Sequence, residues 1–118
     1  MMHARRWTGL LPLAAVLGCA AAPVPAERLA SAEAGIRAAA EVGAEGVPQA
    51  ALHLKMARDQ VAQAKNLVES GDRQRATMIL ARAEADAELS LALARESTAR
   101  AEATAVLAQV QTLRQRSP

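Results

Sequence analysis

Apolar and polar residues follow a helical period through the C-terminal half of the chain. From Asp72 onward there is no Gly and no Pro until Pro118, and Ala, Leu, Glu, Arg and Gln, which favour helices, predominate. We therefore expect one continuous helix from Asp72 to about Arg116. At about 1.5 Å per residue, roughly 43 residues would extend about 65 Å, far more than an ordinary globular helix needs.

A second helical pattern precedes this one, and the two meet at Ser70-Gly71-Asp72. Gly71 suits the left-handed position that ends a helix, and the Asp72 side chain can cap the next one. Apolar residues recur every three or four positions on both sides of this turn, so we expect the two stripes to face each other. The stripes are Leu54, Ala57, Val61, Ala64 and Val68 upstream, and Ala76, Leu80, Ala83, Ala87, Leu91 and Ala94 downstream. Because Ala buries little apolar area, the hairpin has a thin core.

A shorter helical pattern runs from Pro25 to about Val42. Its apolar positions are Leu29, Ala32, Ile36 and Ala39 or Ala40. Glu33 and Arg37 are spaced to pair across one turn of this helix. Gly35, inside the same pattern, costs about 1 kcal/mol relative to Ala and is explained if it allows a close helix crossing.

Gly43, Gly46 and Pro48 separate the first helix from the second, which we expect from Pro48 to Ser70. The sequence thus predicts an all-α fold. It is a three-helix antiparallel arrangement with a short first helix, a helical hairpin turning at Gly71-Asp72 and a long protruding C-terminal helix.

The apolar positions of the long helix change face beyond Ser97 and Thr98. The new stripe is Ala99, Ala103, Val106, Val110 and Leu113. Because this stripe is rotated away from the first, we expect a different packing partner for the distal half of the helix. We interpret it as an interaction face for another protein or for a second copy of the chain.

The N-terminus has the features of a secretory signal. Arg5 and Arg6 precede an apolar run from Trp7 to Leu17, which at about eleven residues is too short to cross a membrane that needs roughly 20. We expect residues 1–18 to be a removable signal peptide.

The apolar run ends in Val16-Leu17-Gly18-Cys19, which resembles the lipobox of bacterial lipoproteins. The resemblance implies cleavage between Gly18 and Cys19, and diacylglyceryl attachment to the Cys19 thiol with N-acylation of the new terminus. The alternative is an unmodified Cys19 in a tail. A disulfide within the chain is excluded because Cys19 is its one cysteine.

Two or three acyl chains hold a protein stably on a membrane, whereas one holds it weakly. Residues 19–25 would then be the acylated Cys and an extended tether, and residues 26–118 the helical domain. Ala20, rather than Asp, follows the cysteine. The resemblance therefore implies an outer-membrane protein that faces the periplasm.

Charge and aromatic content disfavour several classes of function. Arg5 and Arg6 lie in the expected signal, and the remaining twelve basic residues equal the twelve acidic ones. Nucleic-acid binding relies on clustered Lys and Arg and on aromatic platforms, and the chain has no Phe, no Tyr and only Trp7. We expect no nucleic-acid partner and no cofactor.

The residues that could carry chemistry do not form a catalytic or metal-binding pattern. Glu84, Asp86 and Glu88 alternate on a helix and cannot converge on one ion, so we interpret them as a solvated face. His53 has no Cys, His or paired carboxylates at ligand spacing, which favours an exposed or hydrogen-bonded histidine. The serines, including Ser90, lie in helices or at a cap, without a nucleophile elbow. We therefore expect no enzymatic activity and no metal site.

The expected mature chain resembles a family of small, alanine-rich proteobacterial lipoproteins that carry an uncharacterised helical domain, sometimes beside OmpA-like peptidoglycan-binding domains. The resembling stretches are residues 47–52, the turn Ser70-Gly71-Asp72 with Arg75 and Ala76, and residues 81–93. This sequence has no OmpA-like domain, and it ends in Arg-Ser-Pro rather than the Lys that links the major murein lipoprotein to the wall. We expect no covalent peptidoglycan link.

Two functions remain open from the sequence. The first is a non-enzymatic envelope lipoprotein that acts as a structural, spacer or protein-interaction module, with an envelope protein or a second copy on the distal helix. The second is a periplasmic binding or chaperone-like module that holds a lipid, peptide or cell-wall fragment between its helices.

Overall fold

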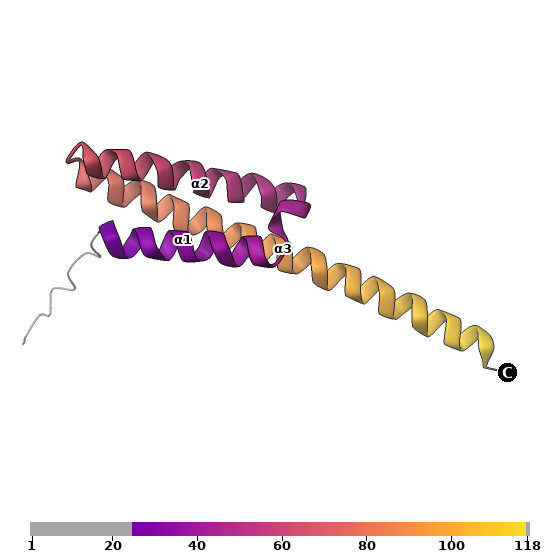
Figure 1. Cartoon of the computed structure of the whole chain (residues 1–118). Coiled ribbons are helices and arrows are strands. Elements are labelled where there is room, and N and C mark those ends of the chain that lie inside the picture. Colours follow the sequence, from indigo (N-terminus) through magenta and orange to yellow (C-terminus); the bar gives the residue numbers. More distant parts are fainter. Residues whose placement is uncertain (1–24, 118) are drawn as a thin grey trace, which may run out of the picture.

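The computed structural model describes residues 25–117 and shows an all-α fold, as the sequence predicts (Figure 1). Its elements are α1 (Pro25–Glu41), the single 3-10 turn η1 (Ala44–Gly46), α2 (Pro48–Glu69) and α3 (Arg73–Arg116). The first helix begins at Pro25, as expected. The expected signal peptide, Gly18, Cys19 and the tether up to residue 24 lie outside the described residues.

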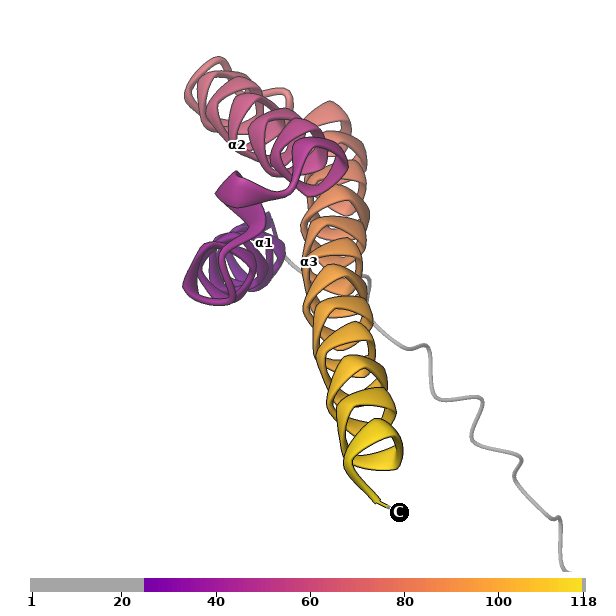
Figure 2. The same cartoon turned by 90° about the vertical axis from the view of Figure 1, so that its right-hand side faces the viewer.

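The three helices form an antiparallel hairpin with a third helix laid against it. α2 and α3 run in opposite directions, and α1 runs antiparallel to α2 and in the same direction as α3 (Figure 1). Figure 2 shows that α1 and α2 both lie on one side of the proximal half of α3. The distal half of α3 projects beyond both, as predicted. At about 1.5 Å per residue, its 44 residues extend about 66 Å.

The turn between α2 and α3 is closed by backbone hydrogen bonds and a side-chain cap. Gly71 has a φ of 85°, and its N–H donates to the Val68 carbonyl while the Asp72 N–H donates to the Leu67 carbonyl. This pair of bonds is the Schellman arrangement. Asp72 Oδ1 then accepts from the Arg75 N–H at 3.1 Å, which caps α3. The expected roles of Gly71 and Asp72 are confirmed.

Small residues dominate the core between the helices. We call the buried face of α3 the inner stripe; it consists of Ala76, Leu80, Ala83, Ala87, Ser90 and Ala94. Two expectations need correction. Ser90 replaces Leu91, which is only partly buried, and on α2 it is Leu67 that packs against the core, while Val68 is 41% exposed.

Gly35 lies at a close approach of α1 to α3. A Cβ atom on Gly35 would lie 3.0 Å from the Cβ of Ala87, tighter than ordinary van der Waals contact. The pair of small residues therefore sets the spacing of the two helices at this point. The expected close crossing is confirmed, and it explains why the helix accepts a residue of low helix propensity.

Of the helices in residues 25–117, none combines the length and hydropathy required to cross a bilayer.

Candidate functional site

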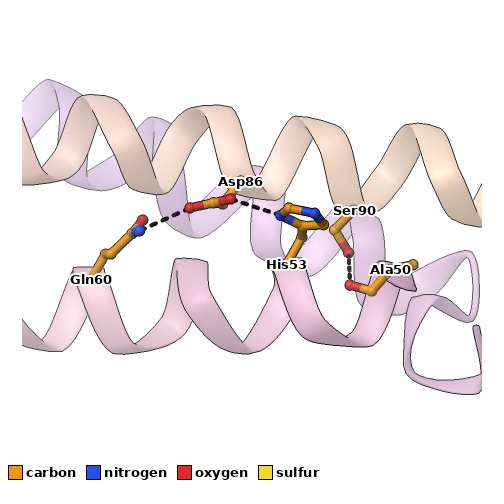
Figure 3. Close-up of polar contacts among 5 residues, drawn as sticks. All are labelled: Ala50, His53, Gln60, Asp86 and Ser90. Atoms are coloured by element: carbon orange, nitrogen blue, oxygen red, sulfur yellow. Dashed lines mark hydrogen bonds and ion pairs between the residues drawn. The ribbon is translucent and has the colours of Figure 1, made fainter. Parts of the chain in front are cut away.

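The polar side chains nearest the core form a short seam between α2 and α3 (Figure 3). Asp86 of α3 accepts two hydrogen bonds from α2, one at each carboxylate oxygen. His53 Nδ1 lies 2.8 Å from Oδ1, and Gln60 Nε2 lies 2.8 Å from Oδ2. Because a carboxylate only accepts, Nδ1 carries the proton of this bond. The expectation of a hydrogen-bonded His53 is confirmed.

Ser90 continues the seam one turn further along α3. Its side chain is fully buried, and Oγ donates to the carbonyl oxygen of Ala50 on α2 at 2.8 Å (Figure 3). The hydroxyl proton is thus committed to a backbone acceptor and no solvent reaches the oxygen. In this arrangement Ser90 cannot act as a nucleophile, because nucleophilic attack needs an accessible oxygen with a base as its partner.

The acidic run on α3 is not the solvated face that we expect from the sequence. Asp86 is held by α2, and Glu84 Oε2 lies 2.8 Å from Nη1 of Arg28 on α1. Of the three acidic residues, Glu88 is the exposed one. Within residues 25–117, no three His, Cys, Asp or Glu side chains are grouped to hold a metal ion. The seam therefore holds α2 and α3 in register through hydrogen bonds.

Glu33 pairs with α2 and not with the neighbour that its spacing suggests. Its Oε1 lies 2.8 Å from Nζ of Lys65, so the expected pair with Arg37 is wrong. The hydrogen bond from Lys65 lowers the pKa of Glu33. Slight burial raises this pKa, and the positive charges of Lys65 and Arg37 lower it further, so that the net shift is downward. The spacing of residues along α1 could not reveal that the partner of Glu33 lies on another helix.

The five residues of the predicted interaction face are all exposed on the distal half of α3. Val106 and Leu113 are each 57% exposed and Val110 is 38% exposed, and the adjacent Leu107 reaches 63%. No part of α1 or α2 extends over this segment (Figures 1 and 2). Among residues 25–117, this apolar face of α3 therefore has no partner.

An apolar groove of about 380 Å³ opens at the other end of the molecule, beside the turn between α2 and α3. Leu29 of α1, Val68 of α2 and Leu80 of α3 line its walls, and Lys65 and Glu69 lie at its edge. The groove is open to solvent. A binding module would need a more enclosed cavity than this open groove.

The comparisons with known proteins identify the domain and give no activity. Neither the curated proteins nor the solved structures include a match to this chain. A family model, the domain of unknown function DUF4398, matches residues 27–106, which span α1, the hairpin and the distal helix as far as Val106. The chain therefore belongs to the DUF4398 family of domains of unknown function.

Proposed function

We propose that this protein is a lipid-anchored protein of the bacterial outer membrane, facing the periplasm, that uses its long helix as a non-enzymatic spacer and interaction arm. The sequence Val16-Leu17-Gly18-Cys19 supports the anchor. The exposed distal face of α3 supports the arm.

The observation that carries the proposal is the position of the first described residue. The N-terminal end of α1 lies at the same end of the molecule as the α2–α3 turn, whereas the C-terminal end of α3 lies at the opposite end (Figure 1). Cys19 precedes Pro25 by six residues. Acyl chains on Cys19 would thus hold the turn end near the membrane, and the distal end of α3 lies about 60 Å along the helix from that end.

Labelling with radioactive palmitate in cells tests the anchor. The wild-type chain is expected to incorporate label and to fractionate with the outer membrane, and Cys19→Ala is expected to lose both. Ser31→Ala, an exposed position on α1, serves as the matched control and should label normally. Label that persists in Cys19→Ala would reject the lipid assignment.

Photo-crosslinking from the distal face tests the arm. A photoreactive residue at Val106 or Val110 is expected to capture one defined partner in the envelope, because these side chains are exposed and apolar. The same probe at Ala62, an exposed position on α2, provides the background. Equal products from both helices would remove the support for an arm.

The groove beside the turn supports a second candidate, a module that binds an apolar molecule such as a fatty acyl chain. Its walls are mainly aliphatic, and it lies at the end of the molecule that the proposed anchor would hold at the membrane. Titration with a fluorescent fatty acid should then be saturable and weakened by Val68→Glu. Val42→Glu, a comparably exposed position outside the groove, should bind as the wild type does. Binding that is unsaturable or unaffected by Val68→Glu would reject this candidate.

A further inference from the structure

A second stripe runs along the outer face of α3 for almost its whole length. It begins at Met78 and includes the predicted distal face. Its residues are spaced alternately by four and three: Met78, Arg82, Ala85, Leu89, Ala92, Glu96, Ala99, Ala103, Val106, Val110 and Leu113. We call this set the outer stripe. Every member is exposed, and all but Arg82 and Glu96 are apolar.

The outer stripe lies opposite the face that α3 uses inside its own chain. From Met78 to Glu96 each member follows an inner-stripe residue by two positions, which is about 200° around a helix. Figure 2 shows α1 and α2 on one side of α3 and no helix on the other. A strict seven-residue repeat of apolar positions is the pattern by which helices of separate chains pack along a common seam.

We propose that the part of the outer stripe from Met78 to Ala103 packs against the same part of a second copy of this chain, with the two α3 helices antiparallel about a two-fold axis. The proposal goes beyond the proposed function, because it names the occupant of the face and its orientation, and it does not depend on acylation of Cys19.

The two charged residues of the stripe disfavour a parallel pair. In a parallel, in-register pair, Arg82 would face Arg82 of the second copy, and Glu96 would face Glu96. Arg95 would also lie beside Arg100 of the second copy. Like charges in direct opposition at a seam are destabilising.

An antiparallel register turns the same residues into a complementary set. When Leu89 faces Ala92 of the second copy, Met78 faces Ala103 and Arg82 faces Ala99. Each larger side chain between Met78 and Glu96 then meets an alanine, which lets this part of the seam close without overpacking. Val106, Val110 and Leu113 lie beyond it, toward Arg75 and the α2–α3 turn of the second copy.

The same register brings opposite charges together. Arg82 lies about one turn from Glu96 of the second copy, and Glu88 lies beside Arg95, with each contact made twice by the two-fold axis. The Glu96 carboxylate is accessible to Arg82 of a second copy, because it pairs with Arg100 of its own helix and remains about half exposed. Charge complementarity of this kind selects the partner and fixes the register.

The available contact length is also sufficient for a specific dimer. In this register the two helices would overlap for about 50 Å, and a contact strip about 10 Å wide on each copy gives roughly 1,000 Å² in total. That area is the lower limit for a specific interface. The many alanines allow the helix axes to approach closely, which improves contact for a given length.

Disulfide trapping between two differently tagged chains tests the orientation. The full chain carries Cys19→Ser, so that its cysteine neither cross-links nor accepts lipid, and is purified in mild detergent. One chain also carries Met78→Cys and the other Ala103→Cys. Oxidation of the mixture is expected to give the heterodimer in high yield, while each variant alone gives little, because like positions lie about 37 Å apart in the proposed register. Cross-linking of either variant with itself in high yield, or no heterodimer, overturns the proposal.

Charge reversal tests the register independently. Arg82→Glu is expected to weaken the dimer about tenfold, and adding Glu96→Arg to the same chain should restore it, as measured by sedimentation equilibrium. Arg73→Glu, on an exposed position outside the stripe, is the matched control and should leave the dimer unchanged. Failure of the double reversal to restore association overturns the register. Because all these chains lack Cys19, a negative result leaves the palmitate test of the anchor unaffected.

Discussion

The inner and outer stripes of α3 have the same seven-residue spacing but different surroundings. The inner stripe contains Ala, Leu and one Ser, and its members are at most 1% exposed because α1 and α2 cover them. The outer stripe contains Arg82 and Glu96, and its larger apolar residues are 38% to 57% exposed. Because both faces have the same repeat, the repeat alone does not reveal whether the helix that packs on a face belongs to the same chain. The residues on the face decide how closely a neighbouring helix can approach.

Truncation of one leucine on each side gives the largest contrast. Leu80→Ala removes one of the two large side chains that are almost completely buried and should lower the free energy of unfolding by about 2–4 kcal/mol. Leu113→Ala, at a position 57% exposed, should change it by less than about 0.5 kcal/mol. Urea unfolding followed by circular dichroism at low protein concentration measures both. Equal losses would mean that the two faces are equally buried in solution.

Replacement of an alanine by leucine on each face of α3, at Ala87 and at Ala85, should give the next largest contrast in stability. Ala87→Leu would force α1 away at the Gly35 crossing and is expected to destabilise the fold by about 1–3 kcal/mol. Ala85→Leu adds the same atoms on the exposed outer face and should leave unfolding of the monomer nearly unchanged. Thermal unfolding of dilute samples compares the pair. A stable Ala87→Leu variant would show that α1 does not pack closely there.

Removal of an acidic residue from each side gives a smaller contrast. Asp86→Ala leaves His53 and Gln60 without their common acceptor, and we expect a loss of about 1–2 kcal/mol. Glu88→Ala, on the exposed side, should cost less than about 0.5 kcal/mol. The histidine resonances of His53 should also shift in Asp86→Ala alone. Unchanged resonances would contradict the hydrogen bond to Asp86.

Local signals in the sequence were sufficient for the three helices and the turn. Gly71 and Asp72 act through bonds to their nearest neighbours, and the spacing of Ala76 and Leu80 reports a buried face directly. Ser90 was missed as a core residue because a pattern of apolar residues passes over a hydroxyl, although its spacing from Ala87 and Ala94 is that of the inner stripe. Its acceptor, the Ala50 carbonyl, depends on the register of two helices.

The same limit applies to the charged residues and to the function. Glu33 has a neighbour at helical spacing, yet it pairs with Lys65 on another helix, and no pattern along one helix reveals that choice. The outer stripe of α3 was visible only in its distal part, because Arg82 and Glu96 interrupt the apolar pattern closer to the turn. The alternating spacing of four and three residues places both parts on one face, and Arg82 and Glu96 are exposed on it in the folded chain.

The smallest expected effect is a pH dependence of the fold's stability, which arises at the contact between α1 and α2. Lys65 donates a hydrogen bond to Glu33 and lowers the pKa of that carboxylate from its ordinary value of 4.5. The folded state therefore holds its proton less tightly than the unfolded state does. The pair stabilises the fold fully above pH 4.5, and this contribution is lost as the pH falls through the lowered pKa of the folded state.

Glu33→Gln isolates this contribution from the rest of the acid response. The variant should be slightly less stable than the wild type at neutral pH and equal to it in strong acid, where the wild-type carboxyl is also uncharged. The effect is small because both side chains remain partly in solvent, which screens their attraction. Glu41→Gln, at the exposed end of α1, is the matched control. A difference between Glu33→Gln and the wild type that grew in acid would have the wrong sign and would exclude the pair with Lys65 as its source.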